Sequence, residues 1–229
     1  MPLLPRRFKK LKSILNRRIS DLTILVEQVE KPHNLSAIMR TCDAAGVLEA
    51  HAVARETKTR TFNSTAQGSQ KWVPLKDHKN IEAAALFLKK QGFKLYGTNL
   101  SVDAIDYRYC DYTGPTAFVL GAEKWGLSEP ATRLMDAAIY IPMRGMVQSL
   151  NVSVAASALL FEALRQREVS GTLPQNGEGL PNEIYEKILF EWCYPEVANW
   201  CNQEGRQYPK LNSEGEILEH IPRAIKVRC

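Results

Sequence analysis

Between residues 22 and 167, short runs of β-branched and aliphatic residues alternate with longer stretches whose apolar residues recur at helical spacing. The runs have the length and composition of buried strands and lie at 22–29, 47–53, 93–98, 116–120 and 138–141. The helical stretches lie at 35–45, 81–91, 129–137 and 151–167. Because a helix usually connects neighbouring parallel strands, this alternation predicts an α/β fold with a mainly parallel sheet flanked by helices.

Prolines and glycines mark the ends of these elements. Pro32 lies shortly after the first predicted strand and disfavours its continuation. Gly46 and Gly92 follow the first two predicted helices, where glycine commonly terminates a helix. In the last predicted helix, the apolar residues from Val152 to Leu164 form one continuous stripe. That stripe predicts a face buried against the sheet.

The two ends of the chain differ from this middle part. Residues 1–18 carry seven Lys and Arg residues and no acidic one, so the other 211 residues carry a net charge of about −2 out of the chain's +5. Phe8, Leu11 and Leu15 recur at helical spacing in this arm and predict a helix with one packed and one basic face. Glycines and prolines between 171 and 181 indicate a linker. We therefore predict a basic helical arm (1–20), a catalytic domain (21–167) and a helical or irregular extension (168–229).

Composition indicates a globular protein of a reducing compartment. A content of 45% hydrophobic and 24% charged residues is typical of a soluble chain, and no apolar run approaches the roughly 18 residues of a membrane helix. The basic N-terminus lacks the apolar segment of a secretory signal. The five cysteines are widely spaced and form no C-x-x-C pair. We expect a cytoplasmic protein with no structural metal and no membrane partner.

In open parallel sheets, ligands bind beyond the carboxyl ends of the strands. Four segments follow predicted strands and hold polar residues that a core would not accept, namely 31–34, 98–101, 121–126 and 143–151. The chain contains neither the G-x-G-x-x-G pattern nor the phosphate-binding P-loop. An ordinary dinucleotide-binding domain or nucleotide triphosphatase is therefore disfavoured.

The last two of these segments have the features of a ligand pocket. Residues 118–126 deliver an apolar strand into a loop between Gly121 and Gly126. Residues 141–155 lead through Met143, Gly145 and Met146 to a helix that Ser149 or Asn151 can cap. Apolar walls and backbone donors suit an adenine ring read by main-chain atoms. Each loop taken alone is better explained as an ordinary tight turn or helix cap.

Three stretches together resemble the motifs of the SPOUT methyltransferases, and more narrowly those of the TrmH-type tRNA guanosine-2′-O-methyltransferases. They are residues 34–41 (NLSAIMRT), 120–126 (LGAEKWG) and 141–153 (IPMRGMVQSLNVS), in the order of the family. The resemblance implies the SPOUT fold, with a trefoil knot in the C-terminal half of the catalytic domain. It also implies a homodimer packed through the knot region and S-adenosyl-L-methionine as cofactor.

The resemblance also implies roles for individual residues. The cofactor-binding positions of the family fall, largely through backbone atoms, on Thr98, Gly121, Ile141 and Leu150. Its catalytic positions fall on Asn34, Arg40, Glu123, Ser149 and Asn151. Because a guanidinium keeps its proton below a pH of about 12, we expect Arg40 to stabilise the developing alkoxide and grip the adjacent phosphate instead of acting as a base.

We expect tRNA, and not DNA, to be the substrate, because the reaction needs a ribose 2′-hydroxyl. The resemblance favours the guanosine at position 18 of the D-loop. We expect RNA contacts from basic residues of the arm and of the end of the last long helix, namely Arg6, Arg7, Lys9, Lys10, Arg17, Arg18, Arg165 and Arg167.

Two alternatives stay open at this point. One is a 2′-O-ribose methyltransferase that acts on rRNA or on another tRNA position. The other is a non-catalytic RNA-binding module of the same fold. An acyl- or phosphoryl-transfer enzyme is disfavoured, since the sequence offers no nucleophile–base constellation or phosphate loop.

Overall fold

The structure, a computed structural model, describes residues 3–29, 31–53, 71–122 and 124–219. The chain forms two compact units, of which one contains residues 19–173 and the other contains residues 1–18 together with 174–229. Among the described residues, no helix is long and apolar enough to cross a membrane.

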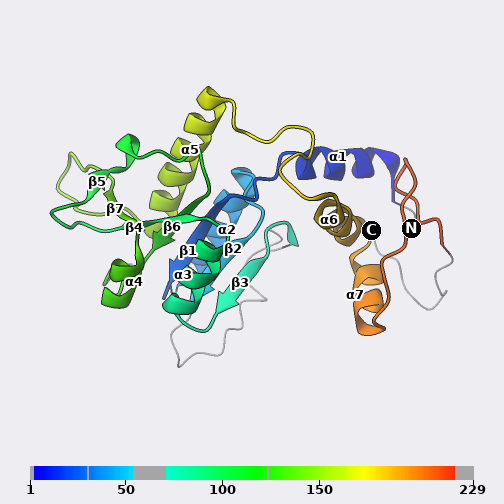
Figure 1. The fold of residues 1–229 in the computed structure, drawn as a ribbon, viewed down its shortest axis with the longest axis horizontal. Helices are drawn as coiled ribbons and strands as arrows, with labels where there is room; N and C mark the ends of the chain where they lie inside the picture. The colour runs from blue at the N-terminus through cyan, green and yellow to red at the C-terminus, as the bar shows by residue number, and fades with distance from the viewer. Residues whose placement is uncertain (1–2, 30, 54–70, 123, 220–229) are drawn as a thin grey trace. The chain divides into compact units, whose positions relative to one another are not determined.

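The unit of residues 19–173 is built on a seven-stranded sheet in the order β3-β2-β1-β6-β4-β7-β5 (Figure 1). All of its strand pairs are parallel, as predicted. The strands are β1 (Leu22–Glu27), β2 (Ala50–Val53), β3 (Leu75–His78), β4 (Lys94–Thr98), β5 (Ile105–Asp106), β6 (Thr116–Leu120) and β7 (Ala137–Tyr140). The central strands β1 and β6 are buried along their whole length, which is typical of a parallel sheet covered on both faces.

Helices cover both faces of this sheet. They are α2 (Pro32–Ala44), α3 (Ile81–Lys90), α4 (Glu129–Leu134) and α5 (Val152–Ser170), with a short 3-10 turn at Tyr107–Tyr109. The apolar faces of α2 and α5 pack in one core with Ile24, Phe118 and Leu120 of the sheet. The other core places α3 and α4 against Leu25 and Val119, whose side chains point to the opposite face of their strands. The unit is therefore a three-layer α/β/α structure.

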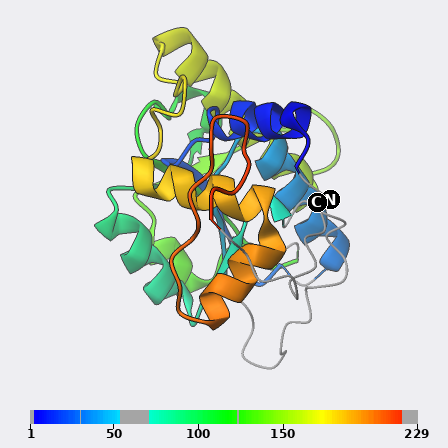
Figure 2. The same ribbon diagram turned by 90° about the vertical axis from the view of Figure 1, so that its right-hand side faces the viewer.

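The unit of residues 1–18 and 174–229 contains α1 (Pro5–Leu15), α6 (Asn182–Cys193) and α7 (Pro195–Gln203). Phe8, Leu11 and Leu15 are buried on one side of α1, which confirms the predicted packed face. Figures 1 and 2 both show α1 lying beside α6. The basic arm is thus part of a folded unit together with the C-terminal segment.

Several elements were not predicted from the sequence, or begin elsewhere. The edge strand β3 has the polar sequence LKDH and β5 has only two residues, so neither shows an apolar run. Helix α2 begins at Pro32, three residues before the predicted start, because proline is well tolerated in the first turn of a helix. Helix α7 lies in the C-terminal extension that we expected to be helical or irregular, but its bounds were not predicted.

Candidate active site

A cavity of about 370 Å³ lies beyond the carboxyl ends of β4, β6 and β7. Its walls include Thr98, Gly121, Ile141 and Leu150, the four positions at which the sequence predicts cofactor contacts. Ser149 also lines it. The structure therefore gathers three loops that are far apart in the sequence around one space of the size that small-molecule sites commonly have.

Gly121 is required where the chain leaves β6. An added Cβ at this position would overlap the carbonyl of Gly126 and the amide nitrogen of Leu127. The loop closes on itself there, because Ala122 N donates to Gly126 O at 3.0 Å and Gly126 N donates to Ala122 O at 2.8 Å. Glu123, a predicted catalytic residue of this loop, lies outside the described residues.

A buried carboxylate that the sequence analysis missed holds the segment after this loop. Glu27, at the end of β1, accepts hydrogen bonds from Ser128 N at 2.9 Å and from Ser128 Oγ at 2.6 Å. Ser128 in turn caps α4 by accepting a hydrogen bond from Ala131 N at 3.2 Å. The sequence could have indicated this role, because Glu27 is an acidic residue inside an apolar run and a buried carboxylate needs hydrogen-bond partners.

Two predicted catalytic residues contact each other. The side-chain amide of Asn151 donates to Asn34 Oδ1 at 3.2 Å. Asn34 is buried in the first turn of α2, while Asn151 is the N-cap of α5 and accepts hydrogen bonds from Ser153 N and Ser153 Oγ. This link joins the start of α2 to the start of α5, whose Val152 and Ala155 line the cavity.

Arg40 is not among the residues that line the cavity of its own chain. It is exposed on α2, and its side chain forms no hydrogen bond or ion pair with another described residue. The next residue, Thr41, instead faces α5, where its hydroxyl lies 3.1 Å from Ser157 Oγ. The fold therefore fixes the helix that carries Arg40 and leaves the guanidinium itself free to meet another molecule.

The loop before α5 and the outer side of that helix expose large apolar side chains. Met146 is 99% exposed, and Val147 is exposed beside it. On α5, Val154 and Phe161 are exposed and seven residues apart, so they lie on one side of the helix. Apolar side chains of this size beside a cavity are typical of a surface that meets another macromolecule.

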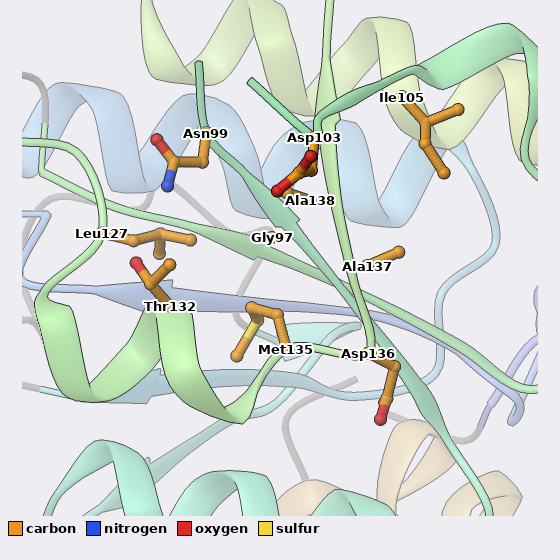
Figure 3. Close-up of a pocket in the computed structure, with 10 residues that line it drawn as sticks. All are labelled: Gly97, Asn99, Asp103, Ile105, Leu127, Thr132, Met135, Asp136, Ala137 and Ala138. Carbon is orange, nitrogen blue, oxygen red and sulfur yellow. The ribbon is translucent and has the colours of Figure 1, made fainter. Parts of the chain in front are cut away.

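A second cavity of about 320 Å³ lies near β4 and β7 and also has Asn99 in its wall (Figure 3). Met135 and Leu127 pack there so closely on Gly97 that an added Cβ would lie 2.5 Å and 2.8 Å from them. Asp136 is engaged by Lys89 Nζ and by Leu95 N, both at 2.8 Å. None of the site residues predicted from the sequence lines this cavity, so the first cavity is the better candidate.

Two of the residues predicted to bind RNA are buried, and for them the prediction is wrong. Arg167 is 1% exposed, and its guanidinium donates to the carbonyl oxygens of Tyr112 and Gly114 and pairs with Asp21. Arg18 is also 1% exposed and packs over the ring of Trp192. Both arginines are therefore part of the packing inside their units, and sequence alone did not distinguish them from surface arginines.

The remaining basic candidates lie at the surface. Five of them are exposed residues on or just after α1, namely Arg6, Arg7, Lys9, Lys10 and Arg17. Arg165 is exposed as well and pairs with Glu162 on the same helix. The arm therefore keeps most of its charge available to a polyanion.

A parallel α/β domain with glycine-bracketed and backbone-rich loops at the carboxyl edge of its sheet belongs to a class of proteins that bind ligands at this edge. Residues 21–161 match the SpoU rRNA Methylase family, and residues 165–220 match its C-terminal region, described as SpoU, rRNA methylase, C-terminal. The chain belongs to the SpoU methylase family.

Individual relatives agree with this assignment. The tRNA (guanosine(18)-2′-O)-methyltransferase of Thermus thermophilus is 55% identical over 186 residues, which are 81% of this chain and 95% of that protein. The crystal structure of the Aquifex aeolicus TrmH/SpoU tRNA modifying enzyme matches with a TM-score of 0.76 at 41% identity, over 84% of this chain and 97% of that chain. The SpoU methyltransferase AviRb of Streptomyces viridochromogenes, solved with its cofactor AdoMet, matches with a TM-score of 0.59 at 29% identity, over 66% and 62% of the two chains.

Proposed function

We propose that this chain transfers a methyl group from S-adenosyl-L-methionine to the ribose 2′-hydroxyl of guanosine 18 in the D-loop of tRNA. The observation that carries the proposal is the one cavity that collects the predicted cofactor positions beside Ser149, together with the Asn34–Asn151 link that joins two of the motifs. The name and high identity of the Thermus thermophilus relative support the choice of substrate.

The residues around the cavity fit S-adenosyl-L-methionine. Leu120, Ile139 and Ile141 provide apolar walls, while the turn at Gly121 brings backbone into the wall where a side chain could not fit. Thr98 is held at the end of β4 by donating to Val119 O at 3.3 Å. When bound, the cofactor supplies an electrophilic methyl group on a sulfonium.

The chain's own residues must then favour the ribose alkoxide, since a protonated hydroxyl is a poor nucleophile. Arg40 stabilises the developing negative charge and binds the neighbouring phosphate through its two-pronged guanidinium. The hydrogen bond between Asn34 and Asn151 holds the starts of α2 and α5 together. Ser149 shapes the loop beside the cavity and contacts the RNA. Glu123 orients the loop after β6 or the target nucleotide.

The active unit is a homodimer packed through the trefoil knot of the SPOUT fold, in the C-terminal half of the catalytic domain. The exposed apolar residues Met146, Val154 and Phe161 support this contact, because a second copy would remove them from water. A second copy could also present its Arg40 to the cavity, which Arg40 of the same chain does not line. The protein acts in the cytoplasm, where its tRNA substrate is found.

Incubation of the purified protein with an unmodified tRNA transcript and methyl-labelled S-adenosyl-L-methionine tests the proposal. We expect the label on the ribose of guanosine 18 after nuclease digestion. Label elsewhere in the tRNA would support a methyltransferase that acts on another tRNA position. Label only in rRNA when total RNA is offered would support the rRNA activity that the family's description names. Failure to bind S-adenosyl-L-methionine in calorimetry would support a non-catalytic RNA-binding module instead.

A further inference from the structure

A hollow of about 370 Å³ lies beside α1, within the unit of residues 1–18 and 174–229. Lys9, Lys12 and Arg17 form one side of it, and Gln175 and Asn176 form the other. Figure 1 shows the segment that leads into α6 running beside α1. We call this space the α1 hollow. It is separate from the cavity described above, and the residues of its second wall belong to the C-terminal extension.

The basic side of the α1 hollow follows from the helical repeat. Lys9, Lys12, Ser13 and Asn16 recur at spacings of three and four residues, so they share one face of α1. That face adjoins the buried stripe that starts at Phe8. Arg7 and Lys10 lie on the same helix and are also exposed, but they do not line the hollow. One helix thus carries two sets of cations in different surroundings.

The opposite wall is held in place by hydrogen bonds. Gly177 N donates to Asn16 O at 3.0 Å, and Tyr185 Oη donates to Asn16 Oδ1 at 2.5 Å. Asn176 and Gly177 have φ of +53° and +84°, a backbone region that asparagine and glycine tolerate best. The side-chain amides of Gln175 and Asn176 therefore extend from a fixed turn and not from a free linker.

The chemistry of the α1 hollow favours an anion. None of the described residues that line it is acidic, and neither Lys9 nor Lys12 forms an ion pair with another described residue. Three cations supply charge, while neutral amides supply directed hydrogen-bond donors. An extended polyanion with regularly spaced phosphates can use both features along the length of the helix.

We infer that the α1 hollow binds phosphates of the tRNA backbone, with Lys9, Lys12 and Arg17 neutralising charge and residues 175–176 donating hydrogen bonds. This inference rests on the proposed tRNA substrate and assigns part of its recognition to the C-terminal extension. It differs from general attraction to a basic arm, because the face of α1 matters as well as its charge.

The test compares two double variants that remove the same charge from the same helix, K9Q/K12Q and R7Q/K10Q. The dissociation constant for an unmodified tRNA transcript is measured by filter binding across a range of salt concentrations. We expect K9Q/K12Q to lose about tenfold more affinity than R7Q/K10Q and to reduce the log–log salt slope by about 2, as the loss of two phosphate contacts predicts. Equal losses of tRNA affinity in the two variants would overturn the inference. A hollow that binds free phosphate in preference to tRNA would give this same result.

A third variant tests the uncharged wall. Asn176→Gly keeps a backbone that tolerates positive φ and removes the amide without a change in charge. We expect a several-fold weaker affinity for tRNA with an unchanged salt slope. Affinity equal to that of the unaltered protein would exclude the C-terminal wall from the site.

These readouts separate the inference from the proposed function. Direct binding of tRNA needs no methyl transfer, and affinity for S-adenosyl-L-methionine should be the same in every variant, since its cavity lies in residues 19–173. If the unaltered protein bound tRNA and methylated none, the proposed function would fail while the comparison of the double variants still decided the role of the α1 hollow.

Discussion

At the scale of single residues, loop residues were easier to identify from the sequence than buried polar ones. Gly121, Ser149 and Asn151 follow strands that are clear in the sequence, and loops at that edge are where ligands bind. Glu27 was missed because it lies in an apolar run and its partner Ser128 is 101 residues away. Arg167 was misassigned for the same reason, since its partners Asp21 and Tyr112 are distant in the sequence.

Gly121→Ala tests the shape of the cavity wall. The added methyl group would overlap the Gly126 carbonyl, so the loop must move away from the position that its two backbone hydrogen bonds define. We expect affinity for S-adenosyl-L-methionine, measured by calorimetry, to fall about tenfold or more, which corresponds to the loss of about 1.4 kcal/mol. Gly145→Ala is a suitable control, because nothing lies within 4 Å of an added Cβ there. Equal affinities in the two variants would contradict the tight turn at Gly121.

Arg40→Lys tests the role of the guanidinium. Lysine keeps the charge but cannot form the paired, planar hydrogen bonds of arginine. Because Arg40 is exposed and its side chain forms no hydrogen bond or ion pair with another described residue, we expect unchanged thermal stability and a kcat about 100-fold lower, similar to the loss of one transition-state donor. Near-normal turnover with an unchanged pH profile would show that guanidinium geometry is irrelevant to the reaction.

At the scale of helices and strands, long apolar patterns determined what could be predicted. Strand β6 has the predicted bounds, and α5 begins directly after its predicted cap Asn151, because both have long, regular apolar patterns and clear end signals. Strands β3 and β5 were not predicted, because they are defined by their pairing with a neighbouring strand and their own composition is not typical of a strand. The polar edge made by β3 has a consequence for acid stability.

His51 of β2 lies buried with its Nδ1 at 3.0 Å from His78 Nε2 of β3. Burial, together with the nearby His78 and Lys76, lowers the pKa of His51 from 6.5 to about 3. Burial, followed by Lys76, also lowers the pKa of His78. Glu49 lies 3.7 Å from His51 Nε2, and its own pKa is raised, chiefly by burial. The folded protein therefore keeps His51 neutral in acid.

The unfolded chain binds a proton at His51 below pH 6.5, whereas the folded chain does so only near pH 3. The free energy of unfolding should therefore fall as the pH falls from 6.5 to 3. We expect His51→Gln to show a shallower fall in urea denaturation between these two pH values. His33→Gln, at an exposed position, should keep the original slope. The same steep fall in His51→Gln would mean that other groups cause the acid sensitivity.

At the scale of the whole molecule, the class of fold followed from the sequence, while the pairing of the two chain ends did not. The basic arm and the C-terminal extension form one compact unit although 155 residues separate them, and residues 19–173 form the other. The charge of the arm suited a polyanion as well as a merely solvated helix, and it gave no sign of the turn at 175–177 that completes a hollow beside α1. Local patterns predict elements well, whereas contacts between distant segments depend on tertiary packing.

In the proposed reaction, the 2′-oxygen of guanosine 18 accepts the methyl group. The most direct measurement compares two tRNA transcripts that differ only in this atom, one with guanosine and one with 2′-deoxyguanosine at position 18. In single-turnover reactions with labelled S-adenosyl-L-methionine, we expect label in the first transcript and none in the second, with similar binding of both. Equal labelling of the two transcripts would contradict it, because the acceptor would then be a different atom.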